Sequence, residues 1–310
     1  MLPKLICIVG PTASGKTALG ISLAKKYNGE IISADSRQIY RGMDIGTAKE
    51  KGEWRAIGGH EALVVGGVPH YGIDLVTPNE PYTVADFQSY ANLVIANIVD
   101  RGKTPFIVGG TGLYVDAVID NFIIPHVPPN PELRTKIEGL IREKGIQEVY
   151  LELLKFDPDA ADFVSLQNSR RIIRALEVCL ATGKPFSKQK KRGKRLYSAL
   201  RIALDVPRDV LYATINARVE HQVRDGLVRE IQHLLALYDP ALPAFSGLGY
   251  DDIIKAIRDE TTLPVALEHY KKRTRDYARR QMTWFRRDKH IKWVRSPEEA
   301  DELVKKFLKA

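Results

Sequence analysis

The segment that most restricts the fold is GPTASGKT at residues 10–17, which matches the pattern G-x-x-x-x-G-K-[ST] in full. The apolar run Leu5–Val9 precedes it, and a helical pattern, Thr17–Tyr27, follows it. A strand, a glycine-rich loop and a helix in this order bind phosphate, because backbone N–H groups and the helix start surround its oxygens. The alternative is a chance match in a structural turn. We predict that a diphosphate or triphosphate contacts Gly10, Pro11, Thr12, Ala13, Ser14, Gly15, Lys16 and Thr17, hereafter the phosphate loop.

Two side chains of the phosphate loop have specific expected roles. Lys16 supplies a positive charge, and the hydroxyl of Thr17 is a candidate ligand for Mg²⁺. Enzymes that hydrolyse nucleotides usually also carry an acidic residue at the end of an apolar strand. The strand Pro105–Val108 ends in glycines instead, which weakens the hydrolase interpretation; Asp205 is the other candidate, its alternative being a turn or cap.

Strands and helical patterns alternate over the first part of the chain. Further strands are predicted at Glu30–Ala34, Pro105–Val108 and Leu200–Val206, and a helix is predicted at Thr83–Arg101, with Thr83 as its N-cap. This alternation predicts an α/β fold with a doubly wound, mostly parallel sheet. Ligands of such sheets bind at the carboxyl ends of the strands.

The alternation stops near Pro125. The segment IIPHVPPNPEL carries four prolines and is predicted to be a boundary or hinge. Helical patterns follow at 132–144, 146–155 and 169–181, and again at 210–238 and 263–285. We therefore predict a core formed by residues 1–124 and 197–310, with a small helical insertion at 125–196.

The charge of the chain is concentrated late in the sequence. The formal net charge is +9, and much of the excess lies in the basic runs 187–195 and 271–289, the second of which includes Tyr277, Trp284 and Phe285. A solvated helix face is one interpretation. The other is a nucleic-acid surface, because cations neutralise phosphates and aromatic rings stack on unpaired bases. No apolar run approaches the roughly 20 residues of a membrane helix, so we expect a cytoplasmic protein without membrane contact. We also expect the protein to be a monomer.

Two further loops follow predicted strands. Asp35 comes directly after the second strand and is followed by Ser36, Arg37 and Gln38, whose side chains suit base edges or phosphates. A strand-end turn or cap is the alternative for Asp35. The loop GGTGLY places the hydroxyl of Thr111 between glycines that permit close backbone approach.

Three arginines share one face of a predicted helix. The segment QNSRRIIRALEV places Arg170, Arg171 and Arg174 on that face, so we expect their guanidinium groups to point in one direction. A salt-bridged helix surface is the alternative. The segment GLGYDDIIKAI, at 247–257, has a turn followed by a helix cap as its simplest interpretation.

Six segments, in order along nearly the whole chain, carry a resemblance. They are GPTASGKT, DSRQIYRGMDIGTAK, GGTGLY, NSRRIIRALEV, GLGY and YARRQMTWFRRD. Together they resemble the tRNA dimethylallyltransferases, also called tRNA isopentenyltransferases. The resemblance implies transfer of a dimethylallyl group from dimethylallyl diphosphate to N6 of the adenosine 3′-adjacent to a tRNA anticodon, with release of diphosphate. It also implies a P-loop kinase-like core, and an insertion that contacts the anticodon arm.

The resemblance also implies roles for single residues. Asp35 is the expected general base, with Lys16 and Thr111 as further catalytic residues, Arg218 as a diphosphate ligand and Mg²⁺ as cofactor. One departure concerns the segment TINAR, where Thr214 replaces the first of two arginines that are common in the family. The expected tRNA contacts are Asp35, Ser36, Arg37, Gln38, Thr111, Arg134, Arg170, Arg171, Arg174, Arg279, Arg280 and Trp284.

Three other functions use the same features. A small-molecule kinase would bind ATP in the phosphate loop and use Asp35 to accept a proton from a hydroxyl. A non-catalytic RNA-binding protein would hold a nucleotide as a structural ligand. An enzyme that prenylates free adenosine nucleotides would share the phosphate loop, but the late basic and aromatic segment favours a polymeric acceptor.

Overall fold

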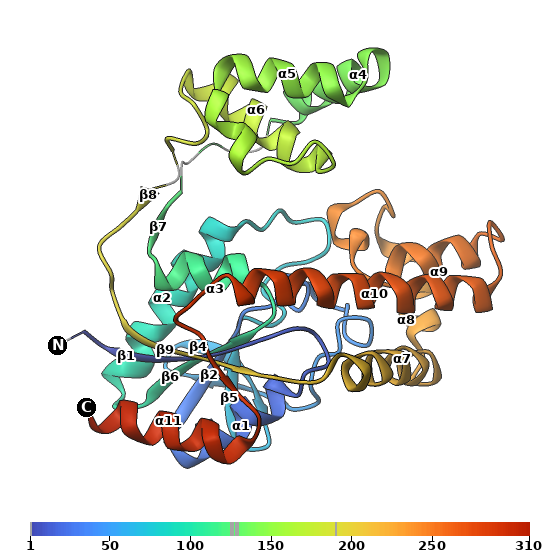
Figure 1. The fold of residues 1–310 in the computed structure, drawn as a ribbon. Coiled ribbons are helices and arrows are strands. Elements are labelled where there is room, and N and C mark those ends of the chain that lie inside the picture. Colours follow the sequence, from blue (N-terminus) through green and yellow to red (C-terminus); the bar gives the residue numbers. More distant parts are fainter. Residues whose placement is uncertain (1, 125–126, 128–129, 190) are drawn as a thin grey trace. The chain divides into compact units, whose positions relative to one another are not determined.

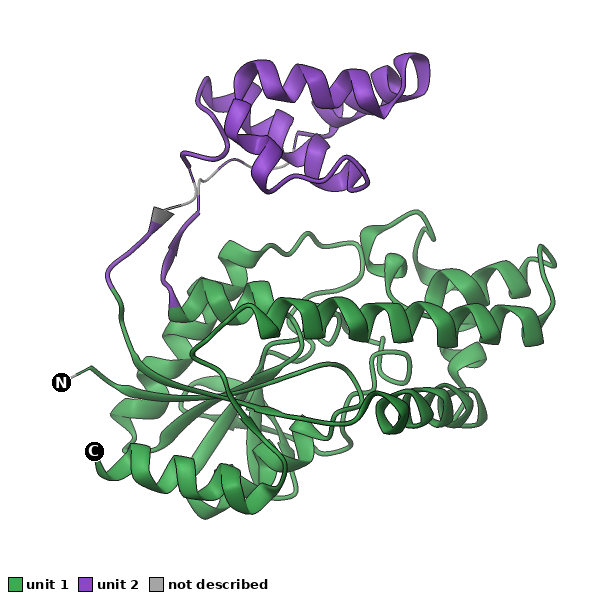
Figure 2. Ribbon diagram, viewed as in Figure 1, with its two compact units in different colours: residues 1–119, 195–310 green, residues 120–194 purple. Residues whose placement is uncertain are grey.

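The chain forms two compact units. The computed structural model describes residues 2–124, 127, 130–189 and 191–310. One unit comprises residues 1–119 and 195–310, and the other comprises residues 120–194 (Figure 2). The boundaries predicted at 125 and 196 differ from these by a few residues. The predicted hinge falls partly on Pro125, Pro128 and Pro129, which lie outside the described residues.

The first unit is built on an eight-stranded sheet with the order β10-β9-β1-β6-β2-β5-β4-β3 (Figure 1). The four predicted strands are confirmed with small shifts at their ends, and they pair in parallel. The antiparallel hairpin of β3 and β4, joined by Gly58 and Gly59 and leading into β5, was not predicted. The strands are β1 (Lys4–Val9), β2 (Gly29–Ser33), β3 (Glu53–Ile57), β4 (His60–Val65), β5 (Val68–Tyr71), β6 (Thr104–Gly109), β9 (Ser198–Leu204) and β10 (Lys292–Val294).

Helices bury both faces of this sheet, as the doubly wound prediction requires. On one face, α2 (Val84–Asp100) and α3 (Gly112–Ile119) pack against β1 and β6. On the other face lie α1 (Lys16–Lys26) and α11 (Pro297–Lys309). The predicted cap of α2 is confirmed, because the backbone N–H groups of Thr83 and Asp86 each bond to the other residue's side chain. The mostly parallel α/β fold is therefore confirmed.

A helical layer follows β9 in the same unit. It comprises α7 (Arg208–Arg224), α8 (Leu227–Leu237), the 3₁₀ helix η2 (Pro243–Ser246), α9 (Tyr250–Ile257) and the long α10 (Leu263–Arg286). The helical pattern predicted at 210–238 is confirmed, but it is divided between two helices, α7 and α8. The two helices are separated at Gly226, whose φ of 108° lies in the left-handed region that favours glycine.

The second unit, hereafter the insertion, has a core of its own. Its helices are α4 (Pro131–Lys144), α5 (Ile146–Phe156) and α6 (Ser169–Thr182), with the 3₁₀ helix η1 (Pro158–Asp162) between the last two. They bury Ile137, Leu153 and Leu176 among other apolar side chains. The short strands β7 (Phe122–Ile123) and β8 (Lys191–Arg192) pair antiparallel where the chain enters and leaves. No helix in the described parts of either unit is long and apolar enough to cross a membrane.

Candidate active site

The phosphate loop connects β1 to α1, as predicted. Gly15 has a φ of 84°, and α1 begins at Lys16, whose Nζ atom donates to the carbonyl oxygen of Pro11 at 3.1 Å. The Oγ atom of Ser14 is buried and has no hydrogen-bond partner in the described structure. Leaving a buried hydroxyl unpaired costs about 1–3 kcal/mol, so the loop fits a ligand that brings its own oxygens.

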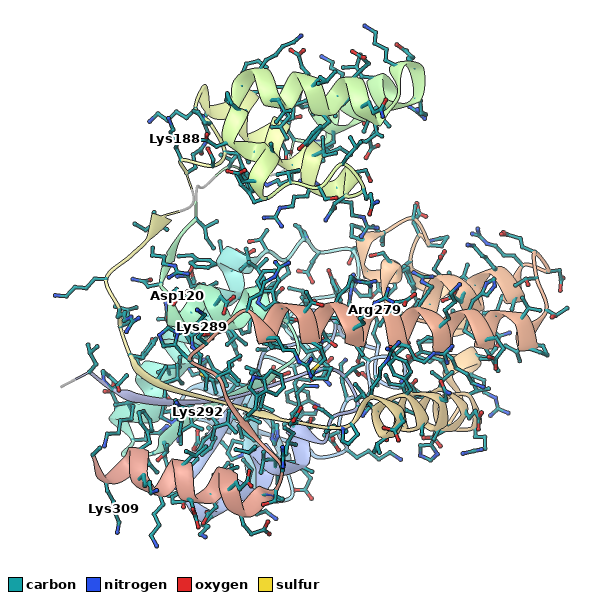
Figure 3. The ribbon with its side chains drawn as sticks, in the orientation of Figure 1. Asp120, Lys188, Arg279, Lys289, Lys292 and Lys309 are labelled. Carbon is teal, nitrogen blue, oxygen red and sulfur yellow. The ribbon has the colours of Figure 1, made fainter. Side chains whose placement is uncertain are left out.

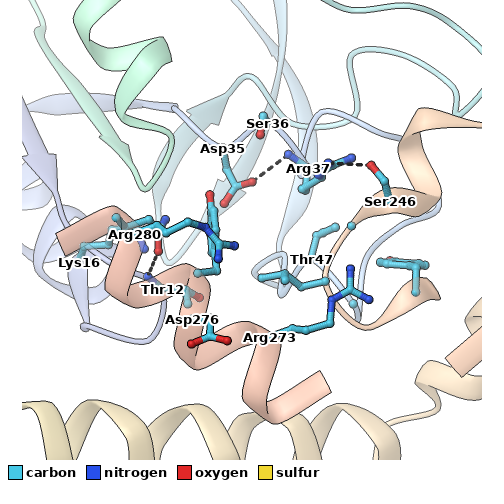
Figure 4. A pocket seen from close by; sticks show the side chains of 16 residues that line it. Thr12, Lys16, Asp35, Ser36, Arg37, Thr47, Ser246, Arg273, Asp276 and Arg280 are labelled. Atoms are coloured by element: carbon cyan, nitrogen blue, oxygen red, sulfur yellow. Dashed lines mark hydrogen bonds between the residues drawn. The ribbon is translucent and has the colours of Figure 1, made fainter. Parts of the chain in front are cut away.

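Two cavities meet at this loop. A smaller cavity of about 410 Å³ and a larger one of about 950 Å³ share Thr12, Lys16, Asp35 and Thr47 in their walls. The larger cavity also contacts Gly15 and the expected metal ligand Thr17. Figure 4 shows Asp35 and Arg280 on the wall of the smaller cavity, together with Arg273 and Asp276 from the same helix as Arg280.

Burial and neighbouring charges shift the pKa values of two basic side chains at the phosphate loop, Lys16 and Arg218. Burial lowers the pKa of Lys16 to about 8; the nearby carboxylate of Asp35 opposes this shift, and the cation of Arg218 adds to it. Arg218 projects from α7 and donates from Nη1 to Oγ1 of Thr12 at 3.1 Å, and burial lowers its pKa as well. Two of the cations that border the larger cavity, Lys16 and Arg218, therefore lie at the phosphate loop, which carries no acidic side chain.

The loop after β2 is held against the loop after β6. The backbone N–H of Arg37 donates to Oδ1 of Asp35 at 2.9 Å, and the N–H of Ser36 donates to Oγ1 of Thr111 at 3.0 Å. The N–H of Thr111 donates to the carbonyl oxygen of Ala34 at 3.0 Å. These contacts bring together Asp35 and Thr111, as the sequence predicted, and fix the carboxylate at the edge of the sheet.

Two of the predicted tRNA contacts have partners within the protein. Arg37 donates to the carbonyl oxygens of Pro243 and Ala244 and to Oγ of Ser246. Gln38 accepts from Ser33 and donates to the carbonyl oxygens at 47 and 48. Arg37 lines the smaller cavity and Gln38 the larger one, but both also hold loops in place.

The late basic stretch forms most of α10 (Figure 3, where Arg279 is labelled). Arg279 is exposed and pairs with Asp276 at 3.2 Å, whereas Arg280 lies over the ring of Tyr277 with 5.7 Å to its centroid. Burial raises the pKa of Tyr277 to about 12, so its hydroxyl is neutral at physiological pH. Trp284 donates from its ring nitrogen to Asp116 at 3.0 Å and covers Gly112.

Sequence reasoning missed a half-buried glutamate, Glu230, that holds the loop at 44–47. The carboxylate of Glu230 accepts from the backbone N–H groups of Asp44, Ile45 and Gly46 at 2.6–3.1 Å, and from the hydroxyl of Tyr250 at 2.8 Å. A Cβ at Gly46 would lie 2.5 Å from the Tyr250 ring. The segment GLGY is therefore more than a turn and cap: its tyrosine supports the loop that carries Thr47. A tyrosine directly after a glycine turn was the only signal that could have suggested this role.

Two arginines of the insertion, Arg134 and Arg174, converge on a buried carboxylate. Glu177 has no exposed side-chain surface; it accepts from Arg134 at 2.9 and 3.0 Å and from Arg174 at 2.7 Å. Arg171 lies over the ring of Phe163, and Arg170 is exposed. The helix face predicted for these arginines therefore does not give one shared orientation, and a salt-bridged surface describes Arg174.

Two other expected sites lie apart from the cavities. Asp205 is exposed, donates its backbone N–H to Val294 and lines neither cavity, so it has no place as the acidic partner of the phosphate loop. Thr214 is exposed on α7, donates to the carbonyl oxygen of Val210 and also lies outside both walls. Within the described ranges, no group of three His, Cys, Asp or Glu side chains could hold a metal ion by itself.

Known proteins share this sequence and fold. The family model described as IPP transferase matches residues 38–288, and that of isopentenyl transferase matches residues 3–53. A tRNA dimethylallyltransferase from Carboxydothermus hydrogenoformans is 45% identical over 98% of this chain and 96% of its own length. The chain belongs to the IPP transferase family.

Solved structures agree with membership of the IPP transferases. A tRNA isopentenylpyrophosphate transferase from Bacillus halodurans is 38% identical, with a TM-score of 0.70 over 99% of this chain and 97% of that one. A eukaryotic dimethylallyltransferase, described as acting on tRNA, is 27% identical, with a TM-score of 0.69 over 91% of this chain and 69% of that one. The family resemblance of the six sequence segments is confirmed, and with it the assignment of this chain as a transferase.

Proposed function

We propose that this chain transfers a dimethylallyl group from dimethylallyl diphosphate to N6 of the adenosine 3′-adjacent to the anticodon of a tRNA. The observation that carries the proposal is the shared wall of the two cavities. Lys16 and Asp35 border both, so a cation for the leaving diphosphate and a carboxylate for the incoming amine lie where two ligands would meet. The match to a dimethylallyltransferase described as acting on tRNA supports this choice of substrates.

The larger cavity suits the prenyl donor. Backbone N–H groups of the phosphate loop, Lys16 and Arg218 would bind the diphosphate, while Ile31, Leu63 and Ile73 give the same cavity apolar walls for the prenyl tail. Negative charge develops on the diphosphate as its bond to the allylic carbon breaks, and prepositioned donors and cations stabilise that charge.

The smaller cavity suits the acceptor base. Tyr277 and Arg280 offer an aromatic ring and a guanidinium plane for an adenine that has left the anticodon-loop stack. The N6 lone pair attacks the allylic carbon as the C–O bond to diphosphate breaks, and Asp35 takes the N6 proton as the C–N bond forms. A positioned base of this kind contributes on the order of 10²–10⁴ in rate.

The phosphate loop also fits a bound Mg²⁺. Mg²⁺ in proteins commonly takes one or two side-chain oxygens together with substrate phosphates and water, and Thr17 offers a hydroxyl on the wall of the larger cavity. The buried hydroxyl of Ser14, which has no hydrogen-bond partner in the described structure, is consistent with a ligand that brings oxygens to the same loop. When bound, the ion would neutralise part of the charge of the diphosphate.

The exposed cations would hold the polymeric substrate. Arg279 and Arg280 on α10, and Arg170 on the insertion, are the proposed contacts to tRNA phosphates, with Trp284 as a stacking partner at the end of α10. We further propose that the protein acts as a monomer in the cytoplasm.

One assay tests the proposal directly. Purified protein, an unmodified anticodon stem-loop and dimethylallyl diphosphate labelled in the prenyl group should give labelled RNA in the presence of Mg²⁺. A stem-loop with guanosine in place of the acceptor adenosine is the matched control and should remain unlabelled. Absence of label in the adenosine stem-loop would contradict the proposal, and RNA-independent phosphate release from ATP in the same preparation would indicate a kinase instead.

A further inference from the structure

One side-chain amide joins the phosphate loop to the loop after β6. Gln281 lies on α10 and is 6% exposed. Its Oε1 accepts from the backbone N–H of Thr12 at 2.9 Å, and its Nε2 donates to the carbonyl oxygen of Gly110 at 2.8 Å. The fit is tight, since a Cβ at Gly110 would lie 2.4 Å from Nε2. A single residue of α10 therefore fixes the backbone of both loops.

Each residue that Gln281 contacts is in turn connected to a side chain of the proposed reaction, Arg218 on one side and Asp35 on the other. The hydroxyl of Thr12 accepts from Arg218 at 3.1 Å, so the residue held by Gln281 also holds a cation of the larger cavity. Gly110 directly precedes Thr111, whose hydroxyl accepts from the loop that carries Asp35. Displacing the amide of Gln281 would therefore disturb the donor and acceptor sides together.

The same helix forms a wall of the smaller cavity. Arg273, Asp276, Tyr277 and Arg280 of α10 line it, and Gln281, the next residue in the chain, lines it as well. An RNA that binds these side chains restrains the helix that carries Gln281. The N–H of Thr12 already has Gln281 as its partner, so the shape of the phosphate loop depends on where α10 lies.

We propose that Gln281 is a positioning residue through which RNA bound along α10 and diphosphate bound in the phosphate loop raise each other's affinity. The inference rests on the proposed function for its two ligands. Coupling between two binding sites is reciprocal, so the factor by which RNA strengthens diphosphate binding must equal the factor by which diphosphate strengthens RNA binding.

Calorimetry with two unreactive probes measures this factor. The dissociation constant of inorganic diphosphate is determined with and without a saturating anticodon stem-loop, and that of the stem-loop with and without diphosphate. For the unaltered protein we expect each ligand to strengthen the other about tenfold, a typical size for such coupling. Equal affinities with and without the second ligand would overturn the proposal.

Two substitutions separate coupling from folding. Gln281→Met keeps the approximate side-chain length and removes both hydrogen bonds, and it should reduce the factor to about one. Gln281→Glu keeps an acceptor for Thr12 but places an oxygen against the carbonyl of Gly110, so it should also reduce the coupling factor. It provides the test if the Met variant is too unstable to measure. Thr283→Ala is the control on the same helix, because Thr283 is exposed and its hydroxyl donates only to the carbonyl oxygen of Arg279.

The outcomes distinguish this inference from the proposed function. A Gln281 variant that binds both probes with the same coupling factor as the unaltered protein would overturn the inference, even if the unaltered protein labels RNA. Loss of coupling in both Gln281 variants but not in Thr283→Ala would support it. Absence of labelled RNA with coupling intact would contradict the transfer reaction and leave the role of Gln281 standing.

Discussion

The core and the insertion use acidic and basic side chains for different purposes. In the core, Lys16 and Asp35 border two cavities, and their charges are available to ligands. In the insertion, Glu177 is fully buried and Arg134 and Arg174 neutralise it within the protein. The comparison teaches that a motif rich in charge does not reveal whether its charges serve a ligand or the fold; only their partners do.

The largest expected effect concerns the shared wall of the core. Asp35→Asn removes the proposed base while keeping the size of the side chain, so turnover should fall by about 10²–10⁴. Single-turnover label transfer at saturating donor and stem-loop measures the loss. RNA affinity and the unfolding midpoint should remain close to those of the unaltered protein. Undiminished turnover would remove Asp35 as the base.

The next effect concerns the insertion, where a substitution should lower the stability of the protein rather than act directly on turnover. Glu177→Gln leaves two arginines, each about a third exposed, facing a neutral amide, and the lost charged hydrogen bonds should cost about 1–3 kcal/mol. Denaturant unfolding should show this loss. Arg170→Gln, which alters an exposed side chain of the same helix, is the matched control and should cost less than about 0.5 kcal/mol. Equal stability of the two variants would contradict a structural role for the Glu177 cluster.

The third effect is a pH dependence of donor binding. Because the pKa of Lys16 is lowered from 10.5 to about 8, the lysine loses its proton as the pH rises through 8. Diphosphate affinity should then weaken by at most about tenfold per pH unit. The free energy of unfolding should instead increase as the pH rises from 8 to 10.5. In this range Lys16 still binds a proton in the unfolded chain but not in the folded protein.

Lys16→Arg tests that assignment, since a guanidinium keeps its charge throughout this range. Inorganic diphosphate also ionises between pH 7 and 9.5, but this change is common to both proteins. The affinity of the unaltered protein relative to that of the arginine variant should therefore fall over this range. The same weakening in both proteins would assign the titration to another group.

The smallest effect concerns two arginines of α10. Arg279→Gln together with Arg280→Gln should weaken stem-loop binding and reduce the slope of log affinity against log salt by about one unit per lost phosphate contact. Arg134→Gln serves as the comparison from the insertion, where the guanidinium bonds to Glu177. An equal loss of slope in Arg134→Gln would show that an arginine paired within the insertion also contacts phosphate, and would weaken the contrast between charges that serve a ligand and charges that serve the fold.

Much of the core could be predicted because its signals are local. The apolar run before the phosphate loop is β1, and the cap at Thr83 begins α2, since each depends on neighbouring residues alone. The break at Gly226 was missed because apolar periodicity continues through α7 and α8 while the backbone turns. Strand-end loops such as those of Asp35 and Thr111 were also predictable, because parallel strands bring their carboxyl ends to one edge.

Pairings between distant segments could not be predicted. Gln281 contacts Thr12 and Gly110, and Glu230 contacts the loop at 44–46, across separations that no periodic pattern encodes. Arg134 is likewise predicted from the sequence as a tRNA contact, because nothing in its spacing indicates that it bonds to the buried carboxylate of Glu177. The sequence identified the chemistry of the loops that carry the site, whereas packing decided which side chains support them.

The pairing of β7 with β8 has an evolutionary consequence. These two short strands hold the beginning and the end of the insertion beside each other, with Phe122 opposite Arg192 and Ile123 opposite Lys191. The segment between β7 and β8 therefore leaves the core and returns to it at neighbouring positions. Closing a loop between neighbouring ends costs little more as its length grows, so lineages can lengthen, trim or exchange this module without rebuilding the catalytic framework.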